Sequence, residues 1–177
     1  LCAREEDSDV VVVNTCGFLK ASEDESREAI NRVLRLKQSG KVRGVVVAGC
    51  LPQRYGGTLT GVDGVDAVVG LGDRREIARL CRKIVGGNGH KDAPKGVADS
   101  FTIAHDPDVG RFRLTPRHYA YVRISEGCDR TCSFCAIPMI RGKFRSKPTE
   151  MIVGEVRELA NDGAKEINLI AQDSTSY

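Results

Sequence analysis

Three cysteines near the end of the chain constrain its fold and chemistry more than any other feature. Cys128, Cys132 and Cys135 form a C-x3-C-x2-C pattern in the run EGCDRTCSFC. Thiolates this close in sequence converge on one object only if a loop wraps around it, and soft sulfur ligands suit iron–sulfur clusters or zinc. Three ligands on a [4Fe–4S] cubane leave one iron open for another molecule. The spacing therefore indicates a cluster-binding loop of an enzyme rather than a purely structural site.

A zinc site is the alternative for the same loop. Zinc would need a fourth ligand, for which His118 is the candidate, and C-x3-C-x2-C is an unusual zinc spacing. A zinc-binding module that docks on RNA is therefore the non-enzyme alternative. The chain has seven cysteines in 177 residues. An odd count without an export signal favours reduced thiols over disulfides.

The composition is typical of a globular protein without a membrane anchor. Hydrophobic residues make up 41% of the chain and charged residues 29%. No apolar run approaches the ~18 residues of a bilayer span, and no signal peptide opens the sequence. We therefore expect a cytoplasmic protein with no membrane partner. The sequence begins at Leu1 rather than Met and ends at Tyr177 just after an expected strand, so we expect a piece of a longer protein.

Strands and helices alternate in the first half of the chain, and this predicts an α/β domain with a parallel sheet over residues 1–86. Continuous β-branched runs are typical of strands buried on both faces, and the first helix opens with a capping-box pattern, Ser22 with Glu25. The expected strands are residues 9–14, 45–48 and 67–69, and the expected helices are residues 22–38 and 73–85.

Two of these expected strands end at a cysteine. Cys16 follows the first strand in the run NTCGF, where we expect a loop, and Cys50 follows the second strand in AGCLP. Parallel strands bring their carboxyl ends to one edge of the sheet, so the two thiols should be neighbours. Two thiolates do not close a cubane, and buried packing is the alternative for both. We expect Cys2, at a helical end, and Cys81, on an apolar helix face, to be buried packing residues.

A polar stretch over residues 87–113 is predicted to be a linker, and a second domain is expected over 114–177. The expected elements of this domain are a strand at 119–124, a helix at 148–162 with Thr149 as N-cap, and a strand at 165–171. They form a βαβ unit. The cysteine loop then leaves the C-terminal end of a strand, where α/β folds place their sites.

The sequence motifs around these cysteines resemble those of a known protein family. C-x3-C-x2-C with an aromatic before the last cysteine is similar to the signature of the radical S-adenosylmethionine superfamily. CAIPMIRG at 135–142 and RSKP at 145–148 resemble its methylthiotransferase family. NTCGF and AGCL resemble two of the three cysteine words of that family's N-terminal domain. The resemblance covers nearly the whole chain. It implies an N-terminal parallel-sheet α/β domain followed by the first βαβ portion of a partial (α/β)6 barrel.

The resemblance also implies the metal ligands and cofactors. These ligands are Cys128, Cys132 and Cys135 for a [4Fe–4S] cluster, and Cys16 and Cys50 for part of a second [4Fe–4S] cluster. The open iron of the first cluster would bind S-adenosyl-L-methionine. The third ligand of the second cluster lies upstream of Leu1 in the family, so we expect it to be missing from this chain.

Three further residues are implied contacts of the S-adenosylmethionine cofactor. Phe134 would border the adenine, and Gln172 and Asp173 would hold polar groups at the end of the next strand. The alternatives are packing for Phe134 and ordinary loop capping for the other two. No catalytic residue is assigned beyond the cluster ligands.

The reaction implied by the resemblance has two candidate branches. TPRHYAY at 115–121, ISEGC at 124–128 and AQDSTSY at 171–177 resemble the branch that methylthiolates an aspartate of a small-subunit ribosomal protein. The other branch modifies an adenosine of transfer RNA. The implied partners are that ribosomal protein, an electron donor and ribosomal RNA. Nine basic against two acidic residues over 111–147 suit an anionic partner, with a solvated basic face as the alternative. We expect this chain alone to be inactive.

Overall fold

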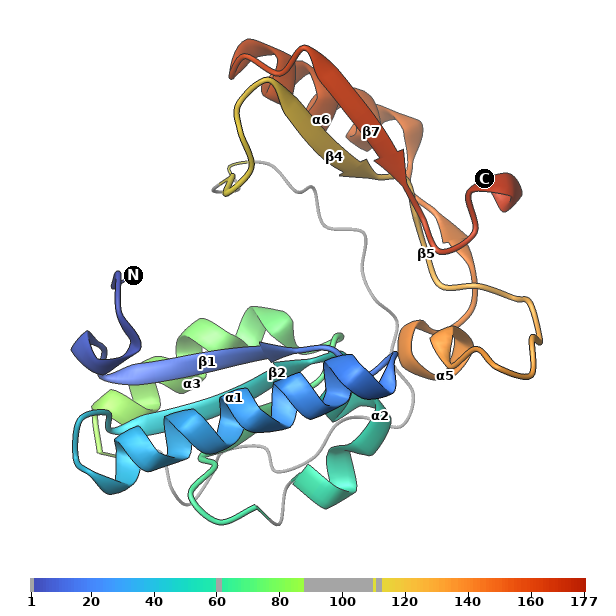
Figure 1. The fold of residues 1–177 in the computed structure, drawn as a ribbon. Helices are drawn as coiled ribbons and strands as arrows, with labels where there is room; N and C mark the ends of the chain where they lie inside the picture. The colour runs from blue at the N-terminus through green and yellow to red at the C-terminus, as the bar shows by residue number, and fades with distance from the viewer. Residues whose placement is uncertain (1, 60–61, 88–109, 111–112) are drawn as a thin grey trace. The chain divides into compact units, whose positions relative to one another are not determined.

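The computed structural model describes residues 2–59, 62–87, 110 and 113–177. The chain forms two compact units, Leu1–Thr102 and Ile103–Tyr177 (Figure 1). The predicted linker over 87–113 lies almost entirely outside the described residues. Within the described part of the chain, no helix is both long and apolar enough to cross a membrane.

The first unit contains a parallel sheet in the order β1-β2-β3. Its strands are β1 (Val10–Thr15), β2 (Gly44–Gly49) and β3 (Ala67–Val69). All six residues of the central strand β2 are buried, because helices pack on both faces of the sheet. This burial accounts for the uninterrupted apolar run of β2. The predicted α/β domain and its three strands are confirmed to within one residue at each end.

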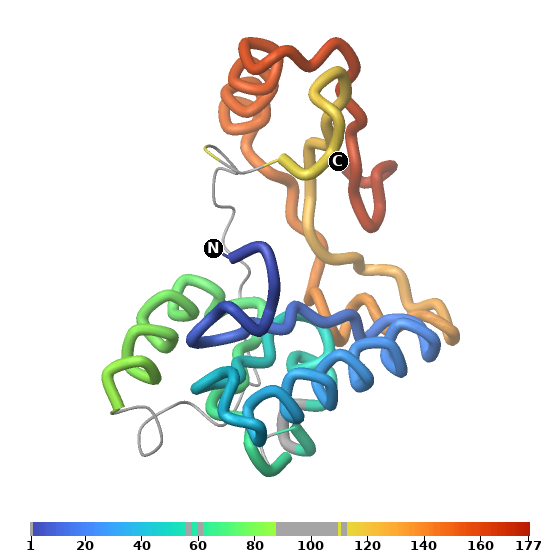
Figure 2. Tube along the Cα trace, turned by 60° about the vertical axis from the view of Figure 1, so that its left-hand side comes forward, coloured from blue at the N-terminus to red at the C-terminus, as the bar shows by residue number. Residues whose placement is uncertain are grey.

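In the described part of this unit, three helices cover the sheet. They are α1 (Lys20–Gln38), α2 (Cys50–Leu59) and α3 (Ile77–Val85), with short 3-10 turns η1 (Glu5–Asp7) and η2 (Arg74–Glu76). Alternate residues of β2 belong to two separate hydrophobic cores. Val45 and Val47 pack with α1 and α2, whereas Val46 packs with Leu80 and Ile84 of α3. Figure 2 shows α1 in blue and α3 in green on different sides of the strands.

One predicted helix start in this unit was wrong, and one helix was not anticipated. The first helix begins at Lys20, with Leu19 as N-cap and no side-chain cap. Ser22 therefore lies inside the helix, and the capping box with Glu25 does not form. A second helix, α2, which the sequence analysis did not anticipate, begins at Cys50 directly after β2. Its Pro52 lies in the first turn, where a proline removes no intrahelical hydrogen bond.

The two cysteines predicted to be packing residues differ in outcome. Cys81 is half-buried and packs against the α3 core, and burial raises the pKa of its thiol. Cys2 is exposed and belongs to no helix, so that prediction was wrong. Its thiol donates to the carbonyl oxygen of Asp7 at 3.4 Å. The acidic run Glu5–Asp7 forms η1 instead of an apolar helical end that could cover Cys2.

The second unit is a βαβ unit, as predicted. Its parallel strands β4 (Tyr119–Arg123) and β7 (Glu166–Ile170) pair in register, and helix α6 (Thr149–Asn161) joins them. Ala120, Val122, Leu159 and Ala164 form its core. Pro148, not Thr149, is the N-cap of α6. The Thr149 hydroxyl instead lies 3.3 Å from the Tyr177 hydroxyl.

Small elements that the sequence analysis did not anticipate surround the cysteine loop. They are β5 (Ser125–Glu126), α5 (Ile137–Arg141), β6 (Arg145–Ser146) and η3 (Ser174–Ser176). β5 and β6 pair antiparallel, with Glu126 opposite Arg145. The cysteine loop therefore runs out from β5 and returns through α5 to β6.

Candidate functional site

The first candidate site lies at the carboxyl edge of the β1-β2-β3 sheet. Thr15 and Gly49 are the last paired residues of β1 and β2, so Cys16 and Cys50 are the next residues of the two strands. Gly17 lies against the second cysteine turn, because a Cβ added there would be 3.0 Å from the Leu51 Cα and 3.1 Å from the Cys50 carbonyl oxygen. The structure thus brings the backbones of the two cysteine turns together.

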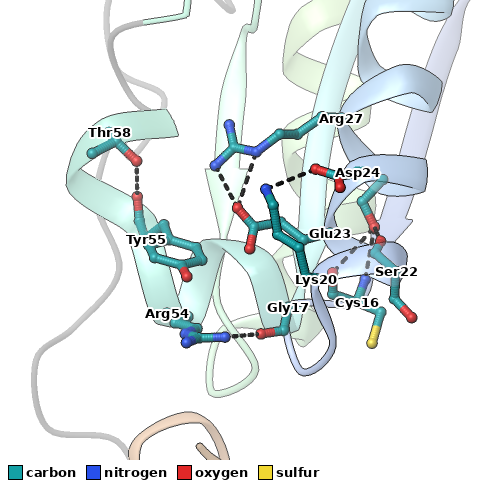
Figure 3. Close-up of polar contacts among 11 residues, drawn as sticks. Cys16, Gly17, Lys20, Ser22, Glu23, Asp24, Arg27, Arg54, Tyr55 and Thr58 are labelled. Atoms are coloured by element: carbon teal, nitrogen blue, oxygen red, sulfur yellow. Dashed lines mark hydrogen bonds and ion pairs between the residues drawn. The ribbon is translucent and has the colours of Figure 1, made fainter.

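Side chains from α1 and α2 anchor the Cys16 turn. The Cys16 N–H donates to the Ser26 hydroxyl at 3.1 Å, and the Arg54 guanidinium donates to the Gly17 carbonyl oxygen at 2.7 Å (Figure 3). Cys16 is exposed and Cys50 is half-buried. Buried packing therefore does not describe Cys16. Cys50 begins α2, whose backbone is non-helical at Tyr55, so only a short helical segment follows this cysteine.

Sequence reasoning missed Ser26 and Arg54, because nothing in their spacing relates them to the cysteines. It also missed the role of Gly49, whose φ is +105°. A Cβ at Gly49 would lie 2.7 Å from the Asn14 side-chain oxygen and 2.6 Å from the Thr15 carbonyl oxygen. A side chain here would push the β1 end away. Both cysteine words thus contain a glycine that permits close approach of the two turns.

The second candidate site is the cysteine loop, which lies between β5 and α5 and has no regular secondary structure. The Cys128 N–H donates to the Gly142 carbonyl oxygen at 3.2 Å, which joins the two ends of the loop. The Cys135 N–H donates to the Cys132 carbonyl oxygen at 3.1 Å, so these two residues bracket one tight turn. Cys128 is buried, Cys135 is half-buried and Cys132 is exposed.

The three thiols fit an iron–sulfur cluster by chemistry and by their place in one loop. All three are free and none is in a disulfide. They are not gathered, however: among the described residues, no group of three or more His, Cys, Asp or Glu side chains is arranged to hold a metal ion. The Arg130 N–H donates to the Cys128 sulfur at 3.4 Å. Ligation would require the loop to close, as expected where metal binding and folding are coupled.

The candidate fourth zinc ligand lies at the wrong end of the strand. His118 directly precedes β4. Its carbonyl oxygen accepts hydrogen bonds from the N–H groups of Lys165 and Glu166, at the start of β7. The cysteine loop follows the other end of β4. Five strand residues span about 16 Å, so His118 cannot join Cys128 on one zinc ion without unfolding this strand.

A buried carboxylate supports the base of the cysteine loop. Glu126 is fully buried, and its carboxylate pairs with Arg123 of β4 and with Arg141 of α5, the latter at 3.2 Å to both oxygens. One side chain thus links the strand that enters the loop to the helix that leaves it. The next residue, Gly127, has a φ of +79°, and a Cβ there would overlap the carbonyl oxygen of Lys143.

Replacing Glu126 with glutamine should destabilise the second unit by about 2–4 kcal/mol, because it leaves two arginines beside a neutral group in a buried setting. Chemical denaturation followed by circular dichroism measures this change. Glu150→Gln, at an exposed position of α6, is the matched control and should change stability by under about 0.5 kcal/mol. Equal effects of the two substitutions would show that the buried network contributes nothing.

Gln172 and Asp173 follow β7 and contact the cysteine loop directly. The Gln172 side-chain oxygen accepts the Gly127 N–H at 2.9 Å. The Asp173 carboxylate accepts the Arg130 Nε at 3.3 Å, and it also caps η3 by accepting the hydroxyls of Thr175 and Ser176. Loop capping is therefore present at Asp173, together with contact to the loop. Phe134 is 88% exposed, so packing does not explain that aromatic residue.

Asp173 should titrate at an unusually low pH. The hydroxyls of Ser176 and Thr175, followed by Arg130, lower the pKa of its carboxyl to about 2. Since this folded-state pKa lies below the ordinary value of about 3.9, the stabilisation of η3 is complete above about pH 4 and is lost as pH falls through about 2. Carboxyl-carbon NMR measures the midpoint. A midpoint near 4, or no change of the Thr175 amide shift during the titration, would contradict this assignment.

Comparisons with known proteins agree with this arrangement. The model of "Uncharacterized protein family UPF0004" matches residues 1–70, and that of "Radical SAM superfamily" matches residues 122–177. Curated relatives include "Ribosomal protein uS12 methylthiotransferase RimO" of Heliobacterium modesticaldum, 43% identical over 100% of this chain and 38% of the relative. The protein of the same name in Geobacter sulfurreducens is 40% identical over 98% of this chain and 38% of the relative. The chain thus spans less than two fifths of the length of these relatives.

Solved structures give the same fold. The radical S-adenosylmethionine methyltransferase TsrM of Kitasatospora setae, with cobalamin and a [4Fe–4S] cluster bound, matches with a TM-score of 0.58 at 19% identity, over 94% of this chain and 37% of that chain. TsrM with tryptophan and a cofactor analogue bound matches with a TM-score of 0.56. At this identity the likeness concerns the fold alone. The family models, the similarity along the whole of this chain and the cysteine loop at a strand end together show that the chain belongs to the methylthiotransferase family of radical S-adenosylmethionine proteins.

Proposed function

We propose that the protein containing this chain methylthiolates an aspartate side chain of the small-subunit ribosomal protein uS12, in the cytoplasm. The observation that carries the proposal is similarity along the whole chain, at about 40% identity, to proteins named for that activity. The word ISEGC around Cys128 and the word AQDSTSY after β7 support the same branch. Both words lie at the carboxyl ends of adjacent parallel strands, where α/β folds bind their ligands.

In this proposal Cys128, Cys132 and Cys135 hold a [4Fe–4S] cluster. When bound there and reduced by one electron from a donor, such a cluster would bind S-adenosylmethionine at its open iron and would supply the radical chemistry needed to abstract hydrogen from an unactivated carbon. The chain's own residues position this chemistry. Glu126 fixes the base of the loop through Arg141, as its buried ion pair indicates.

Three other side chains are proposed to bind the cofactor's organic part. Gln172 and Asp173 already touch the cysteine loop, so their polar groups lie beside any molecule held by that loop. Phe134, between the last two cysteines, offers an exposed aromatic face against which an adenine can stack. The same side chain also keeps water from one side of the bound cofactor.

Cys16 and Cys50 are proposed to hold part of a second [4Fe–4S] cluster, which would supply sulfur. The closeness of their turns at one sheet edge supports this role, since the backbone of Gly17 lies against that of Cys50 and Leu51. Two thiolates are too few for a cubane. We therefore propose that the remaining ligand comes from outside these 177 residues.

The experiment uses the full-length protein, reconstituted anaerobically with iron and sulfide. It is incubated with S-adenosylmethionine and a chemical reductant, in one arm with uS12 and in the other with unmodified transfer RNA. We expect mass spectrometry to find one methylthio group on an aspartate peptide of uS12 and none on any nucleoside. Methylthioadenosine in the RNA arm would assign the protein to the transfer-RNA branch. Modification in neither arm by cluster-loaded protein would overturn the proposal.

A further inference from the structure

The outer face of α3 is strongly cationic, and the proposed chemistry does not use it. The segment 74–85 contains five basic residues against one acidic residue, which are Arg74, Arg75, Arg79, Arg82 and Lys83 against Glu76. The charge on α1 is nearly balanced, with five basic and four acidic residues over 20–38. The excess of positive charge is therefore a property of this helix rather than of all helices in the unit.

The helical period places three of these cations on one side of α3. Arg79, Arg82 and Lys83 stand three and four residues apart, which makes them surface neighbours. Leu80 and Ile84 point the other way and are buried against the sheet, at 1% and 8% exposure. In Figure 2 the green α3 lies apart from the blue α1. The cations thus lie on the side of α3 that faces away from the core.

Carboxylates compensate little of the positive charge of Arg79, Arg82 and Lys83. Arg79 pairs with Glu76, and its side chain is still 50% exposed. Neither Arg82 nor Lys83 forms an ion pair with any residue in the described part of the chain. On α1, by contrast, Lys20 pairs with Asp24 at 2.8 Å and Arg32 pairs with Glu5 at 2.7 Å. Uncompensated cations held close together are costly unless an anionic partner is present.

We infer that Arg79, Arg82 and Lys83, which we call the α3 basic face, bind the phosphate backbone of RNA. Residues three and four apart on a helix have Cβ atoms about 5–6 Å apart, so these long cationic side chains can contact neighbouring phosphates of one strand. Arginine presents a planar fork of donors that matches a phosphate group. Residues 74–85 include no aromatic side chain of the kind that anchors protein partners. These features favour RNA over an acidic protein.

The inference rests on neither cluster nor the proposed reaction, so its test is independent of them. The full-length protein is titrated into a fluorescein-labelled single-stranded RNA of about 20 nucleotides, and anisotropy is recorded at several KCl concentrations. The test variant carries Arg79→Glu and Arg82→Glu. The control carries Lys20→Glu and Arg32→Glu on α1, which changes the net charge by the same amount.

We expect the test variant to bind at least about tenfold more weakly. The slope of log affinity against log salt should fall by about 1.4 for two lost phosphate contacts on a single strand. The control should stay within about twofold of the unmodified protein. Circular dichroism checks that both variants fold. If the test variant does not fold, a variant with Arg79→Gln and Arg82→Gln replaces it. Three results would each overturn the inference. They are equal weakening of RNA binding in the test variant and the control, unchanged RNA binding by the test variant, and displacement of the labelled RNA by polyglutamate as effectively as by unlabelled RNA.

Discussion

Replacing Cys132 with alanine should remove the cluster of the cysteine loop. Three thiolates are the fewest that anchor a cubane while leaving one iron open, and the loop offers no fourth sulfur. Cys132 is the exposed member, so its loss should disturb the apo fold least. In the full-length protein we expect the iron content after anaerobic reconstitution to fall from about eight to about four per chain. S-adenosylmethionine cleavage should fall to background.

Cys81→Ala is the matched control for this experiment. Cys81 is also a free cysteine, but it is half-buried on α3, in the first unit, and packs in the hydrophobic core there. Its replacement should leave the iron content and the visible absorbance unchanged. If Cys132→Ala retained as much iron as Cys81→Ala, the loop would not be the ligand set.

Replacing Gly127 with alanine should destabilise the second unit by about 3 kcal/mol or more. Gly127 has a φ of +79°, which strains any residue with a Cβ, and that Cβ would also overlap the Lys143 carbonyl oxygen and lie 2.6 Å from that of Gly142. Both neighbours are backbone atoms and cannot rotate away. The Gly127 N–H would lose its bond to Gln172, and Cys128 would be displaced. Urea denaturation measures the loss.

The Gly142→Ala substitution measures the cost of backbone strain without steric overlap of the added Cβ. Gly142 has a similar φ of +75°, but nothing lies within 4 Å of its added Cβ. Its φ of +75° and ψ of −165° lie in a region essentially confined to glycine, so we expect a cost of about 1–3 kcal/mol from backbone strain alone, less than that of Gly127→Ala. Equal destabilisation by the two substitutions would mean that the close approach at Gly127 does not matter.

The sequence predicted those parts of the fold that depend on periodicity and burial. The β-branched runs of β1 and β2 and the βαβ pattern of the second unit were all predicted to within a residue or two. Helix starts were less predictable. Leu19 is the N-cap of α1 without a side-chain hydrogen bond, and α2 begins at Cys50 in a segment for which no helix was predicted. Local composition does not show such starts, because tertiary packing overrides weak capping preferences.

The candidate sites likewise contain some residues that the sequence predicted and others that only the structure reveals. The cysteines were found from spacing and from resemblance, and the structure places Gln172 and Asp173 against their loop. The supporting residues could not be predicted. Glu126 resembles an exposed acid in sequence, yet it is buried between Arg123 and Arg141, which are distant from one another along the chain. Long-range partners of this kind become visible only when the strand register is known.

Electron paramagnetic resonance of the reduced full-length protein tests the central claim most directly. We compare the Cys16→Ala/Cys50→Ala variant, which keeps the three loop cysteines but lacks two proposed ligands of the second cluster, with and without S-adenosylmethionine. The account predicts a [4Fe–4S]+ signal from this variant that changes when S-adenosylmethionine binds the open iron. Zinc in place of iron, or a cluster signal that S-adenosylmethionine leaves unaltered, would contradict it.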